Sequence, residues 1–244
     1  MKALYILWLS SLLVVLPSVA APPVLVLNNT NEAPFTTDSH DGYVDLIATE
    51  AFRRAGLSLR LVKDPPERGI INANAGDLDG DLLRIAGLDA QYPNLLRVPE
   101  KLMDWEFSAF GTPKSKAPRW EALGAGTTGH IRGWKIYEQQ LAGVADATAV
   151  IEAPQLFQLL ASKRIEAALY ERWMGLALMR QMNIHGFIAH SPPLAKREMF
   201  IYLHKRHARH VPLLAKALVD MKAEGFYRMA YQKSLAPYLT PAQY

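Results

Sequence analysis

The sequence predicts an α/β protein of two lobes, each a mostly parallel sheet flanked by helices, joined by two extended segments. A run of apolar β-formers at 24–27 is followed by a segment with apolar residues at helical spacing and then by a second strand at 58–62. A strand, a helix and a strand in direct succession form a βαβ unit, which requires a parallel sheet. A second α/β cycle begins near Trp120, so the pattern predicts two such sheets in series.

The first unit is the clearest. Val24 to Leu27 predicts a buried strand, and the polar residues 28–31 after it predict a functional loop that continues through Ala33-Pro34-Phe35. From Gly42 onward apolar residues recur at helical spacing until Gly56, a residue type that commonly ends helices. Ser58 to Val62 then predicts the second strand, so the loop lies at the carboxyl end of the first strand.

Later elements follow the same periodicities. In chain order we expect a helix at 66–75, a turn at 76–80, a short strand at 82–86, an extended segment at 95–110, a short element at 130–132, helices at 134–141 and from Pro154, a strand at 165–170, an extended segment at 199–203, and a helix that Gly225 ends before a final short helix.

The N-terminus has the layout of a secretory signal peptide. Lys2 precedes an apolar run from Ala3 to about Val15, a breaker at Pro17 and small residues up to Ala20. The run is shorter than the roughly 20 residues of a permanent membrane anchor, which is the alternative interpretation. Residues 1–20 are therefore predicted to be removed, leaving a soluble periplasmic protein, and without cysteine there is no lipid-modified form.

Composition narrows the function classes. The chain has 27 basic and 23 acidic residues, and the net charge of +4 is spread along it rather than gathered into a stripe, so we expect no nucleic-acid partner. The absence of cysteine excludes disulfides, thiolate catalysis and cysteine metal sites. The aspartates at 77, 79 and 81 have the spacing that begins a calcium loop, but the glycine is misplaced at Gly80 and Leu88 replaces the glutamate of the twelfth position. Basic residues surround the histidines at 204, 207 and 210, so no metal is expected there either.

Several segments carry a family likeness: 33–35 with 42–46, Gly76-Asp77-Leu78-Asp79-Gly80-Asp81, 163–169, and 202–205 with 221–225. In their order and spacing the chain resembles the extracellular solute-binding proteins of family 3. The resemblance implies the periplasmic-binding-protein-like (type II) fold. Its lobes would be 21–108 with 203–244, and 109–202, with hinge strands at about 105–111 and 198–204.

The same resemblance implies a protein that closes on a ligand and delivers it to an ABC-type permease. The two arginines described below favour a small polar, anionic or zwitterionic, amino-acid-like solute. A sensory protein that signals to a membrane receptor is the alternative, and a periplasmic lyase acting on a small acid is a third. We expect the protein not to be an enzyme, because the sequence has no Gly-x-Ser-x-Gly, Walker or His-Glu-x-x-His motif. We also expect a monomer without a cofactor.

Two arginines are the first candidates for ligand contact. Amino-acid binders of this family carry a Thr-x-x-Arg after the third strand, and the corresponding stretch 88–95 has no such pair. Arg84 follows a buried strand and presents a planar fork suited to a carboxylate or phosphate, although it could instead pair with Asp79 or Asp81. Arg132 is its counterpart in the second lobe, so we expect the two to face each other across the cleft.

Four further residues complete the predicted site. Glu171 would accept hydrogen bonds from a ligand ammonium, with a solvated loop carboxylate as the alternative. Phe35 and Trp134 would stack on the ligand, although aromatic residues at strand ends also serve packing. Arg68 faces either the cleft or water.

Overall fold

A computed structural model describes residues 21–115 and 119–239. The predicted signal peptide, 1–20, lies outside this range. Within it, no helix is long and apolar enough to cross a membrane.

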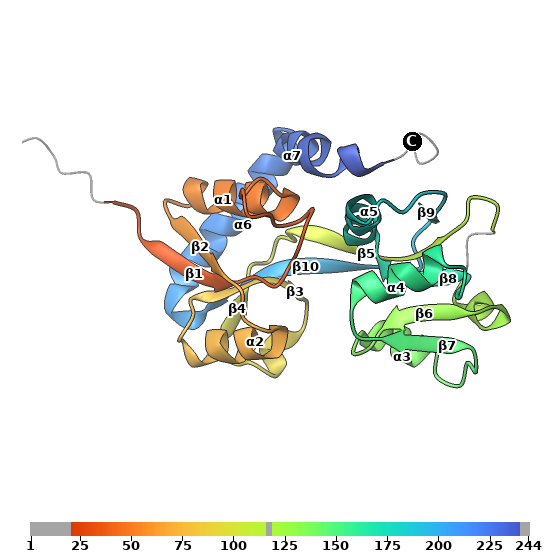
Figure 1. The fold of residues 1–244 in the computed structure, drawn as a ribbon. Helices are drawn as coiled ribbons and strands as arrows, with labels where there is room; N and C mark the ends of the chain where they lie inside the picture. The colour runs from red at the N-terminus through yellow and green to blue at the C-terminus, as the bar shows by residue number, and fades with distance from the viewer. Residues whose placement is uncertain (1–20, 116–118, 240–244) are drawn as a thin grey trace, which may run out of the picture.

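Ten strands form one mixed sheet, which Figure 1 shows as two halves side by side. The strand order is β2-β1-β3-β10-β5-β8-β6-β7, with β4 paired to β10 and β9 paired to β5. Pairing is parallel within β2-β1-β3 and within β8-β6-β7, and antiparallel where β10 and β5 lie between these groups. Two parallel units therefore meet through two central strands.

The first half, on the left in Figure 1, contains strands β1–β4 and helices from both ends of the chain. Its elements are β1 (Val24–Asn28), α1 (Tyr43–Arg54), β2 (Ser58–Val62), α2 (Pro66–Ala75), β3 (Gly80–Ile85), η1 (Leu88–Ala90), β4 (Leu95–Arg97), η3 (Lys205–His210), α6 (Val211–Ala223), α7 (Phe226–Ser234) and η4 (Ala236–Tyr238).

The second half, on the right, is built from the middle of the chain. Its elements are η2 (Trp120–Ala125), β6 (Thr128–Ile131), α3 (Lys135–Gln140), β7 (Ala147–Val150), α4 (Ala153–Ala161), β8 (Ala167–Glu171), α5 (Arg172–Gln181) and β9 (Ile188–Ala189).

Strands β5 (Met103–Gly111) and β10 (Ala195–His204) pass between the halves. They pair with each other over 103–107 and 195–199. Toward its carboxyl end, β10 pairs with β3 and β4. Toward its own carboxyl end, β5 pairs with β8 and β9. Each strand thus belongs to both halves.

The C-terminal segment makes a further connection. Helix α7 packs on α1, and its Tyr231 meets Trp173 of α5 edge to face, with ring centroids 5.6 Å apart. Arg180 of α5 donates from Nη1 to the Pro237 carbonyl oxygen at 3.1 Å. The two halves are therefore linked both by the central strands and by this segment.

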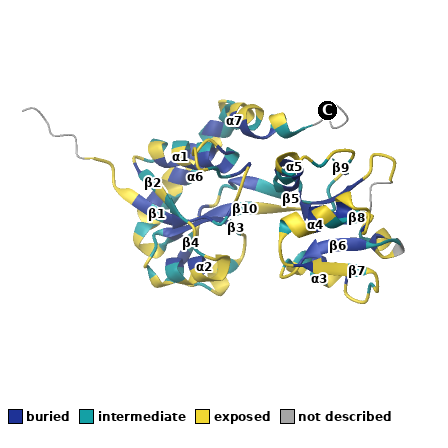
Figure 2. Cartoon of the chain, viewed as in Figure 1, coloured by how far each residue is buried: buried dark blue, intermediate teal, exposed yellow. Residues whose placement is uncertain are grey.

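The start of α1 fixes the loop between β1 and α1. Asp45 is 1% exposed, and its Oδ2 accepts from the Thr37 N–H at 2.9 Å and from the Gly42 N–H at 3.3 Å. These bonds satisfy backbone donors before the helix begins. Helix α1 packs on α6, α7 and strand β2, and its buried residues are coloured dark blue in Figure 2. The loop at 29–42 is thereby held against the carboxyl end of β1.

Candidate functional site

The loop at 29–42 borders three cavities. The cavity that we call the tryptophan cavity has a volume of about 590 Å³ and lies between the ends of β1–β3, the central strands and the second half. The tyrosine cavity, of about 430 Å³, lies between the same loop, α4, α5 and Tyr238. A third cavity of about 700 Å³ is bordered by the loop itself and the end of β2. Residues from both halves line the first two.

Arg84 lines the tryptophan cavity at the end of β3. Its Nη2 donates to Asp81 Oδ2 at 2.7 Å and to the Pro66 carbonyl oxygen at 2.5 Å. Its Nε is buried and has no hydrogen-bond partner. The pair with Asp81, considered from sequence as the structural alternative, is therefore present, yet the side chain is still 18% exposed where it lines the cavity.

Two tryptophans meet in this cavity. Trp105 of β5 and Trp134, which precedes α3, have ring centroids 6.3 Å apart. Trp134 also stacks on Tyr170, at 4.8 Å and an interplanar angle of 18°. Met174 and Met199 add further apolar groups to the lining, which also includes the charged residues Lys63, Asp64 and Arg84. The cavity thus offers flat apolar surface beside a cation, an arrangement that suits a small solute with one anionic group.

The structure brings together only two of the predicted site residues, Arg84 and Trp134. Arg132 and Arg68 are exposed and are not among the described residues that line the three cavities. Phe35 is fully buried and packs on Trp105 at 5.6 Å, so its ring is a core residue under the cavity rather than a surface for a ligand.

Glu171 is also fully buried, and the structure gives it a helix-capping role. Its Oε2 accepts from the Met174 N–H at 2.8 Å at the start of α5, and its Oε1 is 3.4 Å from the Glu106 nitrogen. Burial raises the pKa of this carboxyl to about 8, although the backbone donors oppose the rise. Its oxygens are used inside the protein, and Glu171 does not line any of the three cavities described above.

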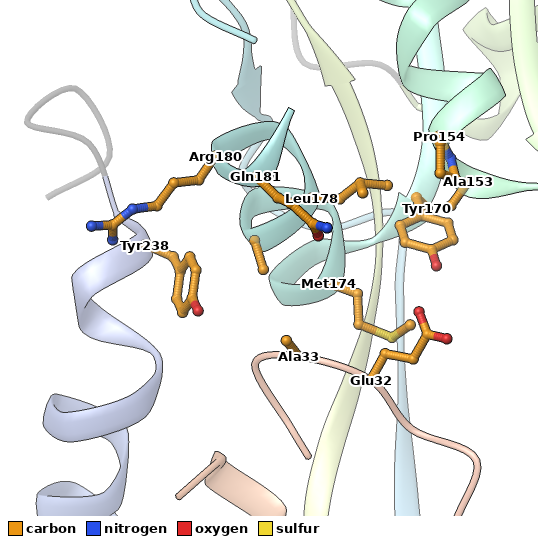
Figure 3. A pocket seen from close by; sticks show the side chains of 11 residues that line it. Glu32, Ala33, Ala153, Pro154, Tyr170, Met174, Leu178, Arg180, Gln181 and Tyr238 are labelled. Atoms are coloured by element: carbon orange, nitrogen blue, oxygen red, sulfur yellow. The ribbon is translucent and has the colours of Figure 1, made fainter. Parts of the chain in front are cut away.

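The tyrosine cavity was not predicted from the sequence. Figure 3 shows Tyr170, Glu32 and Met174 around one end of it, with the Tyr170 hydroxyl directed toward Glu32. Met174 lines this cavity and the tryptophan cavity, so the two are neighbours. Glu32 was missed because no periodicity marks a loop carboxylate, and Met174 was missed because α5 was not expected.

No group of three or more histidine, aspartate and glutamate side chains that could hold a metal ion occurs among the residues described. His207 instead contacts Asp79, with Nε2 and Oδ1 2.5 Å apart, and Arg206 donates to the same oxygen. The histidines at 204–210 thus belong to a structural cluster between β10 and α6.

No protein-family profile matches the sequence. An uncharacterized protein of Shewanella oneidensis is 26% identical over 211 residues, which cover 82% of this chain and 78% of the relative. Because this relative is itself uncharacterized, the similarity does not indicate an activity.

Solved structures are similar over most of the chain. A histidine kinase sensor domain with similarity to periplasmic binding proteins has a TM-score of 0.68 at 13% identity, covering 88% of this chain and 96% of that one. The L-cystine solute receptor of Neisseria gonorrhoeae, unliganded and open, has a TM-score of 0.68 at 16% identity over 88% and 93%. An ancestral arginine-binding protein bound to arginine has 0.66 at 17% over 89% and 100%. At these identities the likeness concerns the fold, and it confirms the α/β architecture predicted from the sequence.

Proposed function

We propose that this chain, which has the fold of the type II periplasmic binding proteins, binds a small solute with an anionic group in the tryptophan cavity. The observation that carries the proposal is the Arg84 side chain, which is 18% exposed and lines a cavity to which both halves contribute. The similar structures named above are binding proteins or a sensor domain. The halves would act as lobes that close on the solute through β5 and β10.

The residues at the cavity divide the work of binding. Arg84 is held in place by Asp81 and the Pro66 carbonyl oxygen, so a guanidinium donor is fixed before a solute arrives. Trp105 and Trp134 offer rings to its apolar part, and Thr30 and Asn31 offer polar groups from the loop. The solute would thus be a small acid or zwitterion with an apolar body, and closure would be the whole mechanism, without bond making or breaking.

In the cell, we propose export to the periplasm by the N-terminal segment and delivery of the solute to an ABC-type permease. Sensing is the second candidate, because a sensor domain of a histidine kinase shares the fold at a TM-score of 0.68. The two differ in the membrane partner. Co-purification of the solute-loaded chain with a permease would support transport, and co-purification with a receptor kinase would support sensing.

Titration of residues 21–244 with amino acids, small carboxylic acids and phosphates should reveal the solute by tryptophan fluorescence. Trp105 and Trp134 line the cavity, so occupation is expected to change their emission in a saturable way. A solute at a hundred times its Kd adds about 2.7 kcal/mol of stability, so the same compound should raise Tm by roughly 5–10 °C.

Arg84→Lys is expected to weaken binding at least about tenfold, because lysine keeps the charge near Asp81 but loses the planar fork. Arg228→Lys, an exposed arginine on α7, is the matched control and should bind as the unaltered protein does. Arg132→Lys separately tests the sequence-based prediction that Arg84 and Arg132 together hold the solute. Because Arg132 is exposed and does not line the three cavities, we expect this variant to bind the solute with unchanged affinity. A cooperative melt without any response across the panel would contradict the proposal.

A further inference from the structure

The Tyr170 side chain combines deep burial with an unused polar group. The residue is 6% exposed, and its ring lies between Trp134, at 4.8 Å, and Phe157, at 5.8 Å. Among the residues described, none hydrogen-bonds its hydroxyl, which lines the tyrosine cavity. The ring is buried, whereas the hydroxyl oxygen is accessible from the cavity, where it can accept a hydrogen bond from an external partner.

A second unused acceptor lies in the same cavity. Glu32 extends its carboxylate toward the Tyr170 hydroxyl, as Figure 3 shows. Its Oε1 is 3.4 Å from Lys63 Nζ, a long pair between side chains that are each 65% exposed and therefore worth little. No described residue hydrogen-bonds Oε2. Burial is the main reason that the pKa of the Tyr170 phenol is raised, and the nearby Glu32 carboxylate raises it further. The phenol therefore stays neutral.

The charges around the cavity decide what kind of ligand fits. Glu32 is an anion, and the Tyr170 oxygen can accept a hydrogen bond through its lone pairs. The cation in the lining, Arg180, lies at the other end: its guanidinium points away from Glu32, donates to the Pro237 carbonyl oxygen and sits over the Tyr238 ring at 5.6 Å. The start of α4, at Ala153 and Pro154, also lines the cavity and would favour an anion, but Pro154 has no N–H to donate.

We propose that the tyrosine cavity is a binding site for a protonated amine, held between the Glu32 carboxylate and the Tyr170 hydroxyl. An alkylammonium has three donors and no acceptor, which matches two acceptors that lack donors. Met174 lines both cavities, so an amine here and an anion at Arg84 can belong to one solute. The inference deepens the proposed function and rests on it only for the claim that the two groups belong to the same molecule.

The test is calorimetric titration of residues 21–244 at pH 7 with n-butylammonium, with 1-butanol as the neutral analogue and with butyrate as the acid. We expect butylammonium to bind at least about tenfold more tightly than butanol, because it adds a charge-assisted contact. Glu32→Gln and Tyr170→Phe should each remove this preference. Neither variant should melt earlier, since Glu32 is exposed and the Tyr170 hydroxyl has no protein partner among the residues described.

Glu121→Gln and Tyr92→Phe are the matched controls, because Glu121 is exposed, Tyr92 is half-buried, and neither lines the three cavities. Equal binding of butylammonium and butanol, or a preference that survives Glu32→Gln, would overturn the amine site. Butyrate bound in a way sensitive to Tyr170→Phe would likewise overturn it in favour of an anion at α4. Amine binding that depends on Glu32 and Tyr170, found without any acid binding sensitive to Arg84→Lys, would uphold this site while the proposal for the tryptophan cavity fails.

Discussion

Replacing Arg84 by alanine is expected to lower the free energy of unfolding by about 3 kcal/mol, and adding Asp81→Asn is expected to restore most of that loss. Asp81 is 2% exposed, and its Oδ2 receives Arg84 Nη2 at 2.7 Å and Asn28 Nδ2 at 3.2 Å. Without the guanidinium, a buried carboxylate keeps a single amide donor. Removing its charge as well relieves the penalty, so the two substitutions should be strongly coupled.

Urea denaturation at pH 7 of the two single variants and the double variant measures this coupling. Asp81→Asn alone should cost less than Arg84→Ala, because the Arg84 side chain is 18% exposed and keeps the Pro66 carbonyl oxygen. Arg228→Ala controls for loss of a surface arginine. Additive effects, with no coupling beyond about 0.5 kcal/mol, would show that the pair is not the main support of Asp81.

The fold was predictable where local pattern and tertiary packing agree. The strand at Ser58–Val62 and the helix at Pro66–Ala75 have the bounds expected from the sequence, because Gly56, Pro66 and Gly76 mark their ends chemically. Helix α5 was not expected, since Gly175 interrupts a segment whose buried residues show little alternation with polar ones. Strand β7 was missed because it is short and largely exposed.

The site was predictable only through strand ends. Arg84 lies at the carboxyl end of a buried strand, where open α/β sheets bind ligands, and it does line a cavity. The same reasoning chose Glu171, whose carboxylate instead caps α5, a helix that had not been predicted. Phe35 is fully buried, and its ring contacts Trp105, a residue distant in the sequence. Sequence position thus indicated the edge of the sheet but not which side chains turn outward.

When the pH is raised from 5 to 8, the unaltered chain is expected to lose about 3 kcal/mol more of its free energy of unfolding than the variant Glu171→Gln loses. The pKa of this carboxyl is raised from an ordinary 4.5 to about 8 in the folded protein, first by burial. The folded state therefore keeps a proton that the unfolded chain releases. This contribution is fully present below pH 4.5 and is lost as the pH rises through 8. Glu106 adds to the rise, whereas backbone donors oppose it.

Urea unfolding of both proteins at pH 5, 6.5 and 8 checks the prediction. Burial lowers the pKa of His130 and His190, which makes stability rise with pH up to about 6.5, but this effect is common to both proteins and cancels in their difference. The amide introduced by Glu171→Gln would mimic the protonated acid, so the two proteins should be similar at pH 5 and the variant more stable at pH 8. Glu121→Gln, on an exposed side chain, should leave the pH dependence unchanged. Parallel curves for Glu171→Gln and the unaltered chain would mean that the buried carboxyl is ionised throughout, with the helix start of α5 and the Glu106 N–H stabilising the charge as well as water does.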